Sequence, residues 1–195
     1  MASVSGWLAL LKRAAGFALI CAGDVTPGEL ANPTPCDRWD LRALLAHCSD
    51  SALVLREAIG SGCVGPPLTD ARPGSGPRRC QDPAAVFRAE ARMLLDACAL
   101  AGAQRQVEVG DRHLAIAIVA ATGAIELAVH GWDISVACGA GRAIPPLLAA
   151  DLLAVTPVVV TEATRPGLFG DGVRVAPLAC PGDKLVALLG RTPAA

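Results

Sequence analysis

The amino-acid sequence predicts an all-α bundle, because most of its 195 residues belong to segments whose apolar positions recur with helical spacing. Glycine and proline separate these segments, as they commonly do at the ends of helices. Residues 107–109 and a stretch within 170–177 are the parts that resemble strands. No internal repeat is visible and the length suits one core, so we expect a single domain over residues 1–195.

Six segments have the periodicity or the boundaries of helices. They are residues 3–22, 40–60, 82–101, 112–138, 145–162 and 183–189. Gly23 and Gly60 are placed to end the first two, and Asp82-Pro83 opens the third with a capping residue followed by proline. The loop at 61–81, rich in glycine, proline and arginine, is the longest, and loops of this length are often functional.

The segment 112–138 is predicted to be the central helix of the bundle. Its stretch from Leu114 to Leu127 carries a single charged residue, Glu126. A helix that is apolar on nearly all sides is normally buried among other elements. Gly139 follows and is expected to end the helix.

Composition and charge argue against two classes of partner. Apolar residues make up 53% of the chain and charged residues 18%, with a mean hydropathy of +0.47. Proline, glycine or a charge interrupts each long apolar run, so no membrane span is expected. A net charge of −1 and a pI of about 6.3 provide no basic surface for nucleic acid. The high apolar content favours a homodimer.

The N-terminus and the cysteines both favour a cytoplasmic protein. Apolar residues already precede Lys12-Arg13 and no cleavage site follows, so an amphipathic helix explains this region better than a signal peptide does. The eight cysteines are widely spaced and form no CxxC pair. We therefore expect buried free thiols in a reducing compartment, rather than disulfides or a cysteine-rich zinc site.

Two polar residues within the apolar segment 112–138 are candidate metal ligands. Glu126 and His130 are four residues apart, so on a helix their side chains leave the same face about one turn apart. A buried carboxylate is costly unless it is paired or binds a cation, and imidazole with carboxylate suits zinc and related ions. His47, on the second predicted helix, is the candidate third ligand, and three protein ligands leave one coordination position open. The alternatives are an exposed Glu126 and a core histidine bound to a carbonyl.

Four further residues lie near these candidates in the sequence or on the same helix. Asp133 shares the face of Glu126, and it is either a hydrogen-bond acceptor for a ligand imidazole or a helix-end interaction. Trp132 is expected in the core or in the wall of a pocket. Cys48 leaves its helix about 100° away from the preceding histidine, so we do not expect it to be a fourth ligand. His113 is about four turns from the pair and is expected to be structural or at the surface.

Several motifs resemble those of a known family. Residues 33–47 resemble the TPCxxWxxxxLLxH signature of the mycothiol-dependent maleylpyruvate isomerase N-terminal domain, one of the DinB-like metal-binding bundles. Residues 126–133 resemble the second signature of that family, and residues 169–170 and 183–193 look like the end of its shorter single-domain members. The resemblance covers nearly the whole chain. It implies an up-down-down-up four-helix bundle, here with additional short C-terminal helices.

The resemblance also implies a metal and a thiol. The family's ligand positions correspond to His47, Glu126 and His130, which would hold a divalent ion, typically zinc. Members with assigned activities use a low-molecular-weight thiol such as mycothiol as co-substrate, for isomerisation or for thiol transfer. The isomerase itself has an additional C-terminal domain, which this chain is too short to contain, so we do not expect maleylpyruvate as the substrate.

Three functions remain open on this basis. The first is a metal-dependent enzyme that uses a mycothiol-like thiol for S-transfer to, or isomerisation of, a small electrophilic metabolite, which enters through the 61–81 loop. The second is a thiol-independent metalloenzyme, a hydrolase, lyase or cyclase, that acts on a specialised metabolite through a metal-bound water. The third is a non-catalytic protein that binds a small molecule.

Overall fold

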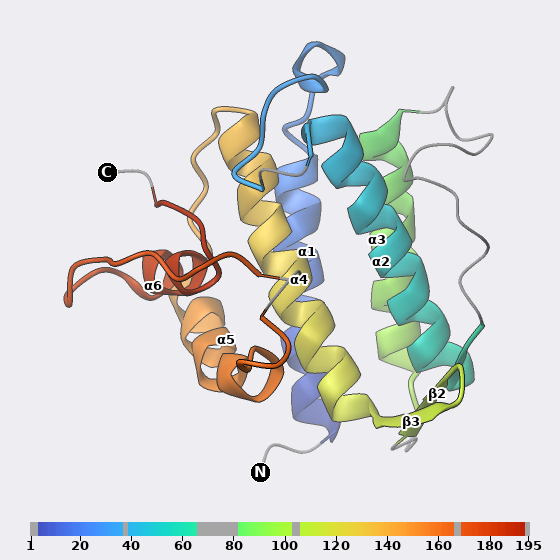
Figure 1. Cartoon of the computed structure of the whole chain (residues 1–195). Coiled ribbons are helices and arrows are strands. Elements are labelled where there is room, and N and C mark those ends of the chain that lie inside the picture. Colours follow the sequence, from blue (N-terminus) through green and yellow to red (C-terminus); the bar gives the residue numbers. More distant parts are fainter. Residues whose placement is uncertain (1–3, 37–38, 66–81, 103–105, 166–168, 194–195) are drawn as a thin grey trace.

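The computed structural model describes residues 4–36, 39–65, 82–102, 106–165 and 169–193. Four long helices lie side by side and form the body of the molecule (Figure 1). They are α1 (Val4–Ala22), α2 (Leu41–Ser61), α3 (Pro83–Leu100) and α4 (Ile116–Ala137). Helices α1 and α2 each pack against both α3 and α4. The predicted all-α bundle is therefore confirmed.

Two shorter helices lie beside this bundle. Helix α5 (Pro146–Val159) packs against α4 and α1, and α6 (Pro181–Leu188) packs against α5 (Figure 1). A single turn of 3-10 helix, η1 (Pro27–Glu29), follows α1. The sequence also predicts a possible strand within 170–177, and the described backbone there contains none.

The ends of the helices follow the capping chemistry of the sequence. The carboxylate of Asp40 accepts a 2.8 Å hydrogen bond from the Ala43 amide at the start of α2, and Asp82 accepts one of 3.0 Å from the Ala84 amide at the start of α3. Helix α2 ends one residue later than predicted, and Gly62, not Gly60, is its cap. The reason is conformational, because the φ of Gly62 is 73°, in the left-handed region that favours glycine.

A small sheet replaces the predicted beginning of the central helix. Residues 112–115 form strand β3 (Arg112–Ala115), which pairs antiparallel with β2 (Gln106–Val109) across a turn in which the φ of Gly110 is 60°. Strand β1 (Cys63–Val64) pairs parallel with β2. The glycine turn makes a hairpin possible here, and the hairpin holds these residues out of α4. His113 therefore lies on β3, exposed, as the surface alternative predicted.

Helix α4 owes its apolar character to its place in the core. By length and composition alone, α1 and α4 could each cross a membrane, but 72% of the most apolar stretch of α4 is buried inside the fold, against 44% for α1. Helix α4 and α1 approach closely at Gly131, where an added Cβ would lie 2.9 Å from the Cα of Ala18. Close packing of this kind explains why the sequence of α4 is so rich in small apolar residues.

The cysteines agree only in part with their prediction. The seven that the structure describes are all free thiols, and Cys80 lies outside the described residues. Cys21, Cys48 and Cys98 are buried, whereas the remaining four are partly or fully exposed. The expectation of buried thiols is wrong for Cys63 and Cys180, which are both exposed. Cys63 lies on the short strand β1 and Cys180 caps the start of α6, so neither lies on a face that packs into the core.

Candidate metal centre

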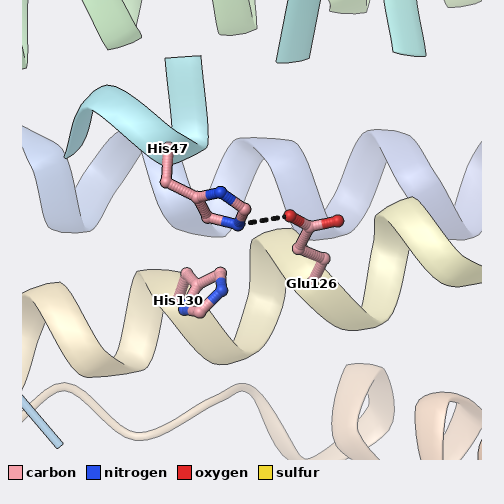
Figure 2. Close-up of side chains that lie close together, drawn as sticks. All are labelled: His47, Glu126 and His130. Atoms are coloured by element: carbon pink, nitrogen blue, oxygen red, sulfur yellow. Dashed lines mark ion pairs between the residues drawn. The ribbon is translucent and has the colours of Figure 1, made fainter. Parts of the chain in front are cut away.

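Two helices bring the three candidate ligands together. His47 lies on α2, while Glu126 and His130 lie one turn apart on α4 (Figure 2). One ligand atom from each residue lies within 4.8 Å of the other two. The imidazole rings of the two histidines have centroids 5.2 Å apart and are nearly perpendicular. The side chains are thus close enough for one ion to contact all three, and metal binding itself stays a prediction.

Glu126 is held by two side chains from α2. Its Oε1 lies 2.7 Å from Nε2 of His47 and accepts a 2.5 Å hydrogen bond from Oγ of Ser51. Ser51 follows His47 by four residues, so both leave the same face of α2. The side chain of Glu126 is 28% exposed, which corrects the expectation that it is buried like its neighbours. It is exposed because it lines a groove between α2 and α4.

The surroundings of Glu126 favour its ionised form. Burial acts to raise the pKa of this carboxyl group, but the hydrogen bond from His47, the positive charge that His130 can carry and the hydrogen bond from Ser51 together act more strongly. The pKa of Glu126 therefore lies below its ordinary value of 4.5. An ionised carboxylate is the form that binds a cation.

His130 is oriented by a buried ion pair. Its Nδ1 lies 2.9 Å from Oδ2 of Asp133, whose side chain is fully buried, and Nη2 of Arg191 donates a 3.0 Å hydrogen bond to the same oxygen. Because a carboxylate accepts hydrogen bonds, Nδ1 is the donor in this contact, and Nε2 is the nitrogen available to a metal ion. Asp133 therefore lies where the acceptor alternative placed it, beside the imidazole of His130, while its role toward a metal ligand stays a prediction. Arg191 offsets the cost of burying the charge of Asp133.

Trp39 covers the ligand imidazoles on one side. Its ring stacks on that of His47, with centroids 4.3 Å apart and planes inclined by 26°, and it meets His130 edge-on at 5.9 Å. Thr34 holds this tryptophan in place, because its hydroxyl donates a 2.8 Å hydrogen bond to the backbone carbonyl of Trp39. The segment 33–40 closes with a bridge between Pro33 and Asp40. The threonine and tryptophan of the first signature therefore have a structural role beside the ligands.

Three other predicted residues lie outside the ligand cluster. Trp132 is 8% exposed and belongs to the core, which is the first of the two positions predicted for it. Cys48 is buried, and burial, together with the negative charges of Glu126 and Asp133, raises the pKa of its thiol well above the ordinary value. The thiol stays protonated and does not join the cluster, in agreement with the prediction. His113 faces Glu108 on the neighbouring strand, 3.8 Å away, and is not part of the cluster.

Sequence reasoning missed three residues of the site. Ser51 could have been found, because its spacing from His47 is one helical turn. Trp39 was noticed only as part of a signature, and no rule of spacing places it on an imidazole. Arg191 is 58 residues from Asp133 and leaves no local signal.

A groove connects the cluster to the surface. It lies between α2 and α4, has a volume of about 440 Å³, and contains His47, Ser51 and Glu126 in its wall. A larger hollow of about 560 Å³ lies between α1 and α5, but the charged groups that line it, Arg13 and Asp151, are already paired with each other at 2.6 Å. The smaller groove is therefore the better candidate for a substrate site.

The residues of the cluster fit a divalent metal ion. Two imidazoles and one carboxylate are donors that zinc and related ions accept. Asp133 contacts Nδ1 of His130, so Nε2 is the nitrogen that could bind the ion. Nε2 of His47 and Oε1 of Glu126 lie 2.7 Å apart in a hydrogen bond, and a cation bound by both atoms would take the place of the hydrogen between them. The hydrogen bond that Nδ1 of His130 donates to Asp133 is the support that metal-binding histidines usually have.

Comparisons with known proteins agree with this picture. A family model described as "Mycothiol maleylpyruvate isomerase N-terminal domain" matches residues 11–135, which include all three ligand candidates. Two uncharacterized proteins of Mycobacterium tuberculosis from two strains, MT0763 and Rv0738, are each 29% identical to the chain over 178 residues. The alignments cover 90% of this chain and 92% of each relative. No solved structure matches significantly.

Proposed function

Because the chain belongs to the mycothiol maleylpyruvate isomerase N-terminal domain family, we propose that it is a metal-dependent enzyme that uses a low-molecular-weight thiol. The thiol, mycothiol or a similar one, would be transferred to a small electrophilic metabolite or would assist its isomerisation. The family is mycothiol-related and metal-binding, with a DinB-like bundle. The reaction and the substrate are the proposal.

The observation that carries the proposal is the His47, Glu126 and His130 cluster at the wall of a groove. Three protein ligands leave a coordination position open, which suits catalysis. A bound divalent ion would favour the thiolate form of a thiol at neutral pH and polarise a substrate carbonyl.

The residues around the cluster have separate tasks in this proposal. Asp133 keeps the proton on Nδ1 of His130, so that Nε2 faces the cluster. Ser51 fixes the carboxylate of Glu126. Trp39 excludes water from one side of the imidazoles, and the groove between α2 and α4 admits the substrate. Of the loop predicted to admit the substrate, residues 61–81, the structure describes residues 61–65, which contain the end of α2 and strand β1, and residues 66–81 lie outside the described residues.

Three further properties belong to the same proposal. Zinc is the proposed metal, because imidazole and carboxylate suit it, although other divalent ions accept the same donors. A cytoplasmic location is proposed, in keeping with the free thiols. We propose a small molecule as the binding partner, no nucleic acid or membrane, and a homodimer, which exposed apolar side chains such as Leu147, at 79%, would support.

Elemental analysis of the purified protein tests the metal site. We expect about one equivalent of zinc or another divalent ion, because three donors converge on one position. His130→Ala should lose the metal, whereas His113→Ala, an exposed histidine outside the cluster, should keep it. Full occupancy in His130→Ala would rule out the assignment.

An activity screen with and without mycothiol then tests the reaction. Turnover that needs both metal and thiol supports the proposal. Turnover without a thiol would instead indicate a hydrolase, lyase or cyclase, and ligand binding without any product would indicate a binding protein.

A further inference from the structure

The groove between α2 and α4 has a polar end and an apolar end. At the polar end, His47, Ser51 and Glu126 meet. From Glu126 the groove follows α4 back past Thr122 to Ile118. Ile118 and Glu126 are eight positions apart, which corresponds to about 12 Å along the helix. A ligand in the groove can therefore reach from the cluster toward the small sheet at the end of the bundle (Figure 1).

Apolar side chains make up the other end. They come from α2, from each of the three strands and from the first turn of α4: Val54, Val64, Val109, Leu114, Ile118 and Val119. Three of them are well exposed, Val54 at 45%, Leu114 at 37% and Ile118 at 38%. Exposed apolar side chains gathered in one hollow are typical of ligand sites, and about 440 Å³ is within the usual range for small molecules.

The charges of the groove have one sign. Asp50 and Glu126 line it, and among the described residues no lysine or arginine does. A second anionic group on a ligand would lose its hydration here without gaining a partner of opposite charge. The groove therefore disfavours a dianion such as a short dicarboxylate.

We infer that the substrate carries an uncharged aliphatic tail of medium length, which fills the apolar end of the groove while its reactive head lies beside His47 and Glu126. The inference rests on the proposed function for the chemistry of the head. Binding of the tail depends only on the groove, so the two can be tested separately.

A series of straight-chain alcohols, from 1-butanol to 1-octanol, tests the tail by isothermal titration calorimetry on the full chain. Each added methylene should tighten binding by about fourfold until the apolar end is filled. Octanedioate, of the same length as octanoate but with a second carboxylate, should bind about tenfold more weakly than octanoate, or worse. Alcohol affinity that does not depend on chain length, or tighter binding of octanedioate than of octanoate, would overturn the inference.

Two variants on the same helix locate the binding. Ile118→Glu places a charge in the apolar end, and Val136→Glu places one on α4 outside the groove at a similar exposure, 36% against 38%. The first should weaken 1-octanol binding by about tenfold and the second should leave it unchanged. Equal affinities in the two variants would show that the alcohol binds elsewhere and would overturn the inference.

His130→Ala separates this inference from the proposed function. If the variant lacks metal but keeps the chain-length series, the tail binds as inferred whatever the reaction is. If the wild-type protein holds its metal but shows no series, the metal site stands and the inferred substrate class is wrong. If the series holds while wild-type protein binds no metal, the proposed reaction alone fails.

Discussion

Arg191 joins the C-terminal segment to the candidate metal centre through one carboxylate. Its guanidinium donates to both oxygens of Asp133, at 3.0 and 3.4 Å, and Asp133 in turn holds His130. The Arg191 side chain is only 10% exposed. It also lies beyond the region that matches the family model, which ends at residue 135. The part of the chain outside the family match therefore orients a candidate ligand, His130, inside it.

Replacing this arginine should weaken metal binding. Arg191→Ala leaves the buried carboxylate of Asp133 without its cation, so His130 is less well oriented, and we expect a loss of metal affinity of about 10–100-fold. Arg191→Lys keeps the charge but cannot donate to both carboxylate oxygens at once. Its metal affinity should therefore lie between that of the wild type and that of Arg191→Ala. Competition with a chelator measures the dissociation constant, and thermal unfolding of the metal-free protein reports folding separately.

Arg165 offers the matched control for this experiment. It lies in the same C-terminal part, and its Nη1 donates to the backbone carbonyls of Gly170 and Leu188 at 2.6 and 3.2 Å rather than to the metal centre. Arg165→Ala should therefore leave the metal affinity unchanged. Equal losses in Arg165→Ala and Arg191→Ala would mean that the C-terminal segment acts only through general stability.

Asp24, which lies just after the end of α1, makes stability depend on pH. The guanidinium of Arg142 donates to both of its oxygens, at 2.5 and 3.0 Å, and these hydrogen bonds hold the pKa of Asp24 below its ordinary value of 3.8. A lowered folded-state pKa stabilises the fold above about 3.8, and this contribution is lost as the pH falls through the folded-state pKa.

Denaturant unfolding of the wild type and Asp24→Asn checks this dependence. The wild type should be more stable at pH 6, and the difference should shrink as the pH falls below 3.8 and through the folded-state pKa of Asp24. Arg142→Gln should show the same convergence, since it removes the same pair. A difference that persists undiminished at low pH would contradict the assignment to this carboxylate.

At the scale of elements, the contact of α1 with α4 depends on a glycine. A Cβ at Gly131 would lie 2.9 Å from the backbone Cα of Ala18 and 3.3 Å from the ring of Phe17. Backbone cannot move aside as a flexible side chain does. We therefore expect Gly131→Ala to push the two helices apart.

Gly131→Ala should destabilise the protein by about 1–3 kcal/mol, the usual cost of overfilling a packed core. Urea unfolding of the metal-free protein measures the change. Gly16→Ala on α1 is the control, because no atom lies within 4 Å of its added Cβ, and it should stabilise by about 0.5–1 kcal/mol through better helix propensity. Stabilisation in both variants would show that the helices are not in close contact at Gly131.

At the scale of the whole molecule, the proposed metal would tie α2 to α4. An ion that binds only the folded chain stabilises it by mass action, by about 2.7 kcal/mol when its free concentration is a hundred times the dissociation constant. Adding zinc to chelator-treated protein should therefore raise the thermal midpoint, with the increase growing as the logarithm of concentration. Adding zinc to His47→Ala should raise the thermal midpoint much less than it does in the wild type. An equal rise in the two proteins would show that the metal binds elsewhere.

Much of this molecule could be predicted from local patterns. Helical periodicity and capping residues placed the ends of most helices within a few residues, because caps and glycines act on their own backbone. The spacing of Glu126 and His130 identified them as a pair on one face, since four residues are one turn of any helix. The same local logic failed at residues 112–115, where pairing with β2 outweighed the helical pattern that continues into α4.

The sequence by itself therefore determined the helices, the all-α class and the identity of the three candidate ligands. Only the tertiary structure decided that Ser51 and Trp39 flank those ligands, that Arg191 neutralises Asp133, and that Glu126 faces a groove instead of the core. The physical reason is the distance along the chain over which each interaction acts. Capping and periodicity act over one or two turns, whereas stacking, ion pairing and burial depend on which distant segments the packing of α2 and α4 brings together.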